Sequence, residues 1–187
     1  MGKIMAHEFI TLDGVIEQPS WTAQYPFDDE MGEAIGRLTD KTILLGRRTY
    51  EMFAQAWPNR TVEDDSGAPF FNESPKYVVS STLDSAEWNN TIILGPYAPE
   101  AIAELKQRID GKIYVSGSAM LVRQMLADGL LDELHLFVYP LTLGSGERLF
   151  VEGEPQARLA PVETETYDSG VVHLAYTPAQ QRLEESQ

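Results

Sequence analysis

The alternation of short apolar runs with segments of helical periodicity constrains the fold of this chain more than any other feature of its sequence. Short, continuous apolar runs are typical of strands that helices cover on both faces of a parallel sheet. The predicted strands are residues 3–10, 41–45, 77–79, 91–94 and 113–115. The predicted helices are residues 28–39, 47–55, 99–109 and 121–126, the last of them capped by Gly129. This order predicts an α/β fold.

The last third of the chain has a different pattern. Apolar and aromatic residues alternate over residues 134–139, as they do in a strand. Residues 161–167 and 170–176 flank an Asp-Ser-Gly sequence that is typical of a hairpin turn. These segments predict antiparallel strands added to the end of the sheet.

The length of 187 residues suits a single domain, which we place over residues 1–178. The polar and acidic residues 179–187 are predicted to form a tail. Residues 56–75 contain three prolines and an acidic patch, so we expect a long loop there. Loops of about 20 residues inside a domain are usually functional or mobile.

Composition excludes several classes of protein. The absence of cysteine rules out a disulfide scaffold, thiolate zinc sites and a cysteine nucleophile. A net charge of −15, with 14 basic against 29 acidic residues, argues against nucleic acid as a general partner, because phosphate neutralisation supplies most of that affinity. No apolar run is long enough for a signal peptide or a membrane span, so we expect no membrane partner and a cytoplasmic location.

Small or hydroxylated residues follow three of the predicted strands, at residues 46–49, 80–82 and 116–119. In an open α/β sheet, ligands bind beyond the carboxyl ends of the strands, and helix N-termini there favour phosphate. Each segment alone is more typical of an ordinary turn. The three together predict a phosphate-binding edge.

Four of the 14 basic residues lie within residues 37–48, including Arg47 and Arg48 at a predicted helix start. Two arginines are electrostatically unfavourable there, because the helix dipole prefers anions at its N-terminus. A bound phosphate would resolve the conflict, since the guanidinium fork matches phosphate oxygens. The alternative is a solvated pair bridged to the abundant carboxylates.

The remaining candidates for chemistry carry little signal. His7, His135 and His173 lack metal-ligand spacing and are predicted to be packed or surface side chains, and the acidic clusters are predicted to be solvated faces. The chain has no Gly-x-Gly-x-x-Gly fingerprint, no P-loop and no Gly-x-Ser-x-Gly elbow. A standard Rossmann site and a serine hydrolase are therefore poorly supported.

Six motifs between residues 3 and 150 resemble those of the dihydrofolate-reductase-like family, and specifically stand-alone relatives of the reductase domain of riboflavin biosynthesis. They are Thr11-Leu12-Asp13-Gly14-Val15-Ile16, Leu45-Gly46-Arg47-Arg48-Thr49-Tyr50-Glu51, Lys76-Tyr77-Val78-Val79-Ser80-Ser81-Thr82-Leu83, Tyr114-Val115-Ser116-Gly117-Ser118-Ala119, Gly129-Leu130-Leu131-Asp132-Glu133-Leu134 and Leu143-Gly144-Ser145-Gly146. Each motif is loose, but the set in this order is specific.

The resemblance implies a three-layer dihydrofolate-reductase-like fold, with a mixed sheet of about eight strands whose C-terminal strands are antiparallel. It also implies an NADPH groove. Its residues would be Gly46, Arg47 and Thr49 at the phosphates, Ser80 and Ser81 near the adenosine ribose, Gly117, Ser118 and Ala119 at the pyrophosphate, and Phe9 and Ile16 at the nicotinamide. Arg47 is the candidate for the 2′-phosphate.

Such a site transfers hydride to the carbon of a C=N or C=O group, and a proton must also reach the acceptor. The candidate donors are Asp13, Glu17 and Asp28, although the local pattern of dihydrofolate reductases does not match. Asp13 is also a natural turn former in an Asp-Gly pair. Trp21 is a candidate wall of the substrate pocket.

The predicted function is that of an NADPH-dependent reductase of a pteridine-like or aminopyrimidine substrate, similar to 5-amino-6-(5-phosphoribosylamino)uracil reductase. The alternatives are a nucleotide-binding module without catalysis and a dihydrofolate reductase. Without cysteines, the chain cannot carry the zinc deaminase to which riboflavin reductases are often fused. The resemblance implies a homodimer, for which residues 134–139 and the following Gly-rich segment offer a pairing surface.

Overall fold

The computed structural model describes residues 1–27 and 29–179. Its strands are β1 (Lys3–Thr11), β2 (Thr42–Gly46), β3 (Lys76–Val79), β4 (Thr91–Gly95), β5 (Lys112–Ser116), β6 (Glu133–Tyr139), β7 (Leu159–Thr166) and β8 (Val172–Pro178). Its helices are the 3-10 turn η1 (Pro19–Gln24), α1 (Asp29–Gly36), α2 (Arg47–Ala56), α3 (Ala68–Glu73), α4 (Pro99–Arg108) and α5 (Ala119–Ala127). Apart from Ala179, the predicted polar tail lies outside the described residues.

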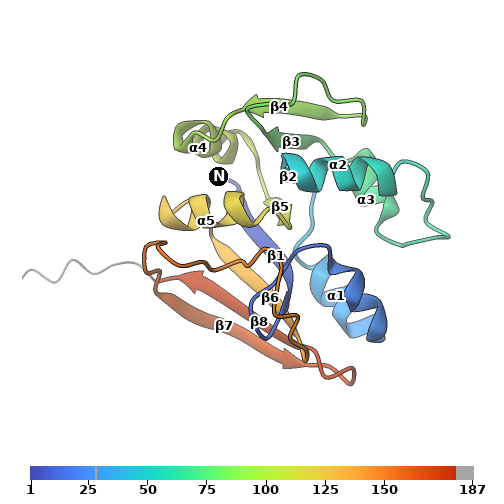
Figure 1. Cartoon of the computed structure of the whole chain (residues 1–187). Helices are drawn as coiled ribbons and strands as arrows, with labels where there is room; N and C mark the ends of the chain where they lie inside the picture. The colour runs from blue at the N-terminus through green and yellow to red at the C-terminus, as the bar shows by residue number, and fades with distance from the viewer. Residues whose placement is uncertain (28, 180–187) are drawn as a thin grey trace, which may run out of the picture.

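The strands form one eight-stranded mixed sheet in the order β4-β3-β2-β5-β1-β6-β8-β7. The first six strands of that order are mutually parallel, whereas β8 pairs antiparallel with both β6 and β7. Helices α4 and α5 lie on one side of the sheet, and α1 and α3 lie on the other (Figure 1). The predicted three-layer fold with antiparallel C-terminal strands is therefore confirmed.

The middle of the sheet is buried on both faces, as its apolar runs predict. In β2, Leu44 packs with α4 and α5, while Ile43 and Leu45 pack with the aromatic side chains on the opposite side. All three side chains are fully buried. Each apolar run thus contributes to two cores at once, which explains why these strands do not alternate between apolar and polar residues.

The segment predicted to be one long loop, residues 56–75, is partly helical. It contains α3, whose Pro69 occupies the first turn. Proline is tolerated there because the first helical N–H groups have no partner within the helix. The prediction treated this proline as a helix breaker, and for that reason it missed the helix.

The pairing surface predicted on residues 134–139 is wrong in this structure. Strand β6 is paired on both of its edges, with β1 on one side and β8 on the other. Its residues are mostly buried, so its apolar character serves the core. The outer strands of the described sheet are β4 and β7.

Strands β1 and β5 separate near their carboxyl ends, and this fork positions the candidate site. Their pairing ends at His7 and Ser116, where β5 turns toward α5. Strand β1 continues along β6 as far as the pair of Thr11 and Tyr139. Glu8 is the first residue of β1 beyond the last pair. In the described part of the chain, no helix is long and apolar enough to cross a membrane.

Candidate functional site

Two of the three predicted strand ends meet through one hydroxyl group. The backbone N–H of Gly46 donates to Oγ of Ser118 at 2.8 Å, and the same Oγ lies 2.9 Å from Oγ1 of Thr49. The contact is possible because β2 and β5 are neighbours in the sheet and both end at this edge. The structure therefore brings together the turns that begin α2 and α5.

Gly117 occupies the most constrained position in this joint. Its φ of +60° is in the left-handed region, and a Cβ built on it would lie 2.9 Å from Oγ1 of Thr49. Glycine is therefore required both by conformation and by space. The absence of a side chain lets the two turns approach each other and leaves the backbone of residues 117–118 close to any ligand at this edge.

Helices α2 and α5 both begin without a side-chain cap. The N-cap residues are Gly46 for α2 and Ser118 for α5, and neither makes a side-chain hydrogen bond to its own helix. The first-turn N–H groups of a helix lack intrahelical partners and carry a positive partial charge. Two such groups side by side fit the phosphates of a nucleotide cofactor. Ala119, the first residue of α5, packs into the core beneath them.

Arg47 links α2 to the turn after β3. Its guanidinium forms an ion pair with Glu51 at 3.0 Å, one helical turn along α2, and donates to the hydroxyl of Thr82. The Oγ of Ser80 accepts hydrogen bonds from the backbone N–H groups of Thr82 and Leu83, which makes it a turn former. The neighbouring Ser81 is exposed. The third predicted strand end thus joins the other two through Arg47.

Asp13 anchors two loops to each other. Its carboxylate accepts from Oγ1 of Thr11 at 2.6 Å and from the backbone N–H groups of Leu143 and Gly144 at 3.2 and 2.7 Å. The hydrogen bond from Thr11, followed by that from Gly144, lowers the pKa of Asp13 to about 2. An acid with this pKa is ionised at neutral pH, so the geometry favours the turn-forming role over proton donation.

The other predicted donors occupy peripheral positions or lie outside the description. Glu17 is exposed, and its Oε2 accepts from the backbone N–H of Glu147 at 3.1 Å. Glu147 also pairs with Arg48 of α2 at 3.2 Å, so its loop reaches across to the phosphate edge. Asp28 is not among the described residues.

The residues predicted at the nicotinamide and substrate lie around the first loop. Ile16 packs in the core formed with α4 and α5, while Phe9 contacts the ring of Tyr139 on the opposite side of the sheet. Trp21 is buried against the same tyrosine, and its indole N–H donates to the carbonyl of Glu17 at 3.3 Å. Trp21 therefore fixes the first loop on the sheet, and its contact with substrate remains a prediction.

Glu8 is a site residue that the sequence prediction missed. It lies on β1 at the fork, it is only 2% exposed, and its Oε1 has no hydrogen-bond partner among the described residues. Burial raises the pKa of Glu8, and the negative charge of Glu147 adds to the increase, while a hydrogen bond with the backbone of Gly117 opposes it. One feature could have identified Glu8: it is an acidic residue within a strand, and the residues next to it in that strand are buried on both faces of the sheet.

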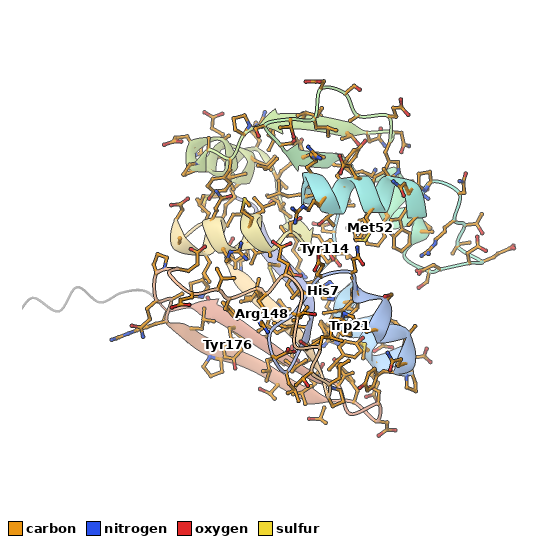
Figure 2. The ribbon with its side chains drawn as sticks, in the orientation of Figure 1. His7, Trp21, Met52, Tyr114, Arg148 and Tyr176 are labelled. Atoms are coloured by element: carbon orange, nitrogen blue, oxygen red, sulfur yellow. The ribbon has the colours of Figure 1, made fainter. Side chains whose placement is uncertain are left out.

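A second buried polar group lies on the opposite face of the same strand. Nδ1 of His7 is 2.9 Å from the hydroxyl of Tyr114, whereas its Nε2 has no partner in the described part of the chain. Figure 2 shows this pair between helix α2 and Trp21. Burial lowers the pKa of His7 to about 3, so the imidazole is neutral. His7 is thus packed, as predicted, but it has a free hydrogen-bonding atom.

The other two histidines form a buried pair away from this edge. Nδ1 of His135 lies 3.0 Å from Nε2 of His173, and the outer nitrogens contact Glu133 and Glu165. Both imidazoles are buried within the sheet. The prediction that these histidines are packed side chains is confirmed.

Two hollows of the molecule do not coincide with the predicted phosphate edge. A groove of about 740 Å³ between α2 and the residues before β4 includes Tyr50, Asn72 and Trp88. A cavity of about 190 Å³ near the start of β1 includes Arg37 and His135. The phosphate edge consists of helix N-termini on an open surface, which explains why it does not form an enclosed hollow.

Comparison with known proteins agrees with this geometry. Residues 2–173 match the model of the RibD C-terminal domain family. The chain is 30% identical over 177 residues to the uncharacterized protein YyaP of Bacillus subtilis (strain 168), which covers 93% of this chain and 94% of that protein.

Solved structures with lower identity show the same fold. A protein attributed to riboflavin biosynthesis from Shewanella sp. PV-4 superposes with a TM-score of 0.74 at 19% identity, covering 95% of this chain and 99% of that one. A pyrimidine reductase-like protein from Corynebacterium diphtheriae gives 0.65 at 16% identity, covering 96% and 92%.

The dihydrofolate reductase of Enterococcus faecalis, solved with NADP(H), gives a TM-score of 0.62 at 17% identity, covering 95% of this chain and 96% of that one. The family match and the shared fold lead to one conclusion. The chain belongs to the RibD C-terminal domain family, a dihydrofolate-reductase-like family of reductases whose members use NAD(P)H.

Proposed function

We propose that this protein is an NADPH-dependent reductase that transfers hydride to a C=N or C=O carbon of a pteridine-like or aminopyrimidine substrate. The observation that carries the proposal is the joint between two uncapped helix N-termini, made by Ser118 with Gly46 and Thr49. This arrangement presents unpaired N–H groups from two helices to one ligand. A dinucleotide with two adjacent phosphates matches it.

The chain's own residues would bind and orient the cofactor. The backbone at Gly117 and the first turn of α5 would hold the pyrophosphate, and Arg47 would pair with the 2′-phosphate by exchanging part of its contact with Glu51. The side chains of Phe9 and Ile16 lie on opposite sides of the sheet, so the backbone around these two residues would line the nicotinamide, which supplies the hydride when the cofactor is bound. The exposed Ser81 would contact the adenosine ribose.

The side of the sheet that carries α1 and α3 supports the proposed substrate class. This side is lined by aromatic rings, among them Phe9, Tyr114 and Trp21, which favour a flat heterocycle. Nε2 of His7 is a polar atom in this apolar wall without a partner among the described residues. An acceptor ring such as a pterin or pyrimidine offers nitrogen and oxygen atoms for it. The names of the relatives point to the same class of substrate.

Fluorescence titration of the purified protein with NADPH tests the cofactor, and loss of the reduced nicotinamide absorbance over a panel of pterins, dihydrofolate and aminopyrimidines tests the activity. We expect NADPH to bind and one heterocycle class to be reduced. Binding without turnover on any panel member would favour the nucleotide-binding module. Tight binding of methotrexate would favour a dihydrofolate reductase, and no NADPH binding would overturn the proposal.

We also propose that the protein forms a homodimer. The internal position of β6 removes the surface that the sequence predicted for it, so the dimer would use an outer strand such as β7. Most of β7 is exposed, including Val162. Sedimentation at micromolar concentration should give a dimer, and a monomer there would contradict the proposal.

A further inference from the structure

Glu8 combines full burial with an unsatisfied oxygen at the one place where the central strands separate. It is the first residue of β1 beyond the last pair with β5, and its carboxyl lies near the backbone of Gly117. Its Oε1 has no partner in the described part of the chain. Buried polar groups are nearly always hydrogen-bonded, so an exception at a candidate site points to a group that arrives later.

Burial raises the pKa of Glu8 and so favours the protonated form of its carboxyl. An ionised carboxylate would need a cation or several donors in this environment. The charge of Glu147, which has the same sign, acts on this carboxyl, and Arg48 is already paired with Glu147. A protonated carboxyl offers one O–H donor and a carbonyl acceptor, whereas a carboxylate could only accept.

The proposed cofactor has a complementary group. The carboxamide of nicotinamide carries N–H donors and one C=O acceptor, which together match a neutral carboxyl. Glu8 contacts the backbone of Gly117, proposed for the pyrophosphate, and directly precedes Phe9, whose side chain lies with His7 on the opposite face of β1. A cofactor whose pyrophosphate is bound at the turn after β5 and whose other end extends toward Phe9 would therefore pass through the gap between β1 and β5.

An ion pair at the surface lies close enough to Glu8 for its charge to act on this carboxyl. Arg48 of α2 pairs with Glu147, whose negative charge raises the pKa of Glu8, and the Arg48 side chain is 84% exposed. Exposed ion pairs of this kind stabilise little. Arg48 can thus exchange Glu147 for a cofactor phosphate without disturbing the core, because the loop of Glu147 stays attached through the hydrogen bond from the N–H of Ile16 to the carbonyl of Glu147 at 2.9 Å.

We propose that the buried carboxyl of Glu8 binds the nicotinamide carboxamide in the fork between β1 and β5 and thereby positions the reactive ring. This inference rests on the proposed function. It assigns to Glu8 a contact that distinguishes the nicotinamide end of the cofactor from its phosphate end.

The test compares NADPH with 2′-phospho-ADP-ribose, which lacks nicotinamide, on the wild type, Glu8→Met and Glu8→Gln. Met has nearly the shape of Glu but lacks both hydrogen-bonding groups, so we expect NADPH to bind about tenfold more weakly or worse. The affinity for 2′-phospho-ADP-ribose should not change. Gln keeps a donor and an acceptor, so Glu8→Gln should retain most of the NADPH affinity.

Thermal unfolding of the unliganded protein provides an independent readout. Glu8→Met removes the unsatisfied Oε1 but also the hydrogen bond with the backbone of Gly117, so the two effects oppose each other and we expect little change in Tm. A purely structural role for Glu8 predicts a clear decrease in Tm. Failure of Glu8→Met to fold, or a lower Tm with unchanged NADPH affinity, would overturn the inference.

The two ligands also separate this inference from the proposed function. Equal weakening of NADPH and 2′-phospho-ADP-ribose would show that Glu8 only supports the phosphate turn through Gly117, and would overturn the assigned contact. If the wild type bound neither ligand, the proposed function itself would fail.

Discussion

The hydroxyl of Ser118 lies 2.9 Å from the hydroxyl of Thr49, and through this contact the turn after β5 is tied to the first turn of α2. The same oxygen of Ser118 accepts the backbone N–H of Gly46. One side chain therefore sets the distance between two helix N-termini that belong to separate parts of the sequence. The geometry of the proposed phosphate site depends on it.

Ser118→Ala should weaken NADPH binding about tenfold and lower the free energy of unfolding by about 1–2 kcal/mol, because the N–H of Gly46 loses its acceptor. Fluorescence titration and urea unfolding measure the two effects. Ser169→Ala is the matched control, since the buried hydroxyl of Ser169 has no partner among the described residues. A Ser118→Ala protein with unchanged NADPH affinity would contradict the role of this joint.

Gly117→Ala should lower the free energy of unfolding by more than the positive φ of this residue alone predicts. An L-residue with positive φ costs about 1–2 kcal/mol, and here the added methyl group would also press against Oγ1 of Thr49. Gly153→Ala is the control, because Gly153 also has a positive φ but has no atom within 4 Å of a built Cβ. Thermal unfolding should show a larger loss for Gly117→Ala, and only this variant should lose NADPH affinity. Equal losses would remove the steric argument.

Arg47→Ala should weaken NADPH far more than NADH, because only NADPH carries the 2′-phosphate that the guanidinium would hold. The ratio of the two dissociation constants is the measurement. Arg48→Ala is the neighbouring control and should change both cofactors similarly, since Arg48 pairs with Glu147 rather than with the turn at Thr82. Equal losses for both cofactors in Arg47→Ala would exclude the 2′-phosphate assignment.

His7 and Glu8 should make opposite contributions to the pH dependence of stability. Burial lowers the pKa of His7 from 6.5 to about 3, so the stability that neutral His7 contributes is present above pH 6.5 and is lost as the pH falls. Burial raises the pKa of Glu8 above 4.5, so its contribution is present below pH 4.5 and is lost as the pH rises. Between these values His7 changes the free energy of unfolding by about 1.4 kcal/mol per pH unit, and Glu8 changes it in the opposite direction.

Replacing one of the two residues should reveal the pH dependence of the free energy of unfolding that the other residue contributes. Relative to the wild type, Glu8→Gln should gain stability as the pH rises from 4.5 to 6.5, and His7→Phe should lose it. Urea unfolding at several pH values in this interval measures both. Parallel curves for the wild type and both variants would show that neither group titrates differently in the folded and unfolded states.

Local patterns in the sequence were sufficient for most of the secondary structure. The run at residues 43–45 has the pattern of a strand buried on both faces, and the glycines at positions 46 and 117 mark the turns where two helices begin. These signals can be recognised locally because strand burial, helix periodicity and glycine turns each depend on a few neighbouring residues. Helix α3 was missed because a proline in its first turn also resembles a loop signal.

The tertiary structure decided which acidic residue has which role. In the sequence, Asp13 is a candidate proton donor and Glu8 is one residue of a strand. In the fold, hydrogen bonds from Thr11 and from a loop about 130 positions away lower the pKa of Asp13, and Glu8 is buried beside a turn more than 100 positions away. The pKa of a side chain depends on burial and on partners that are distant in the chain, so no local pattern could assign these roles. The sequence determined the strands and turns of the site, and the packing of the sheet determined its chemistry.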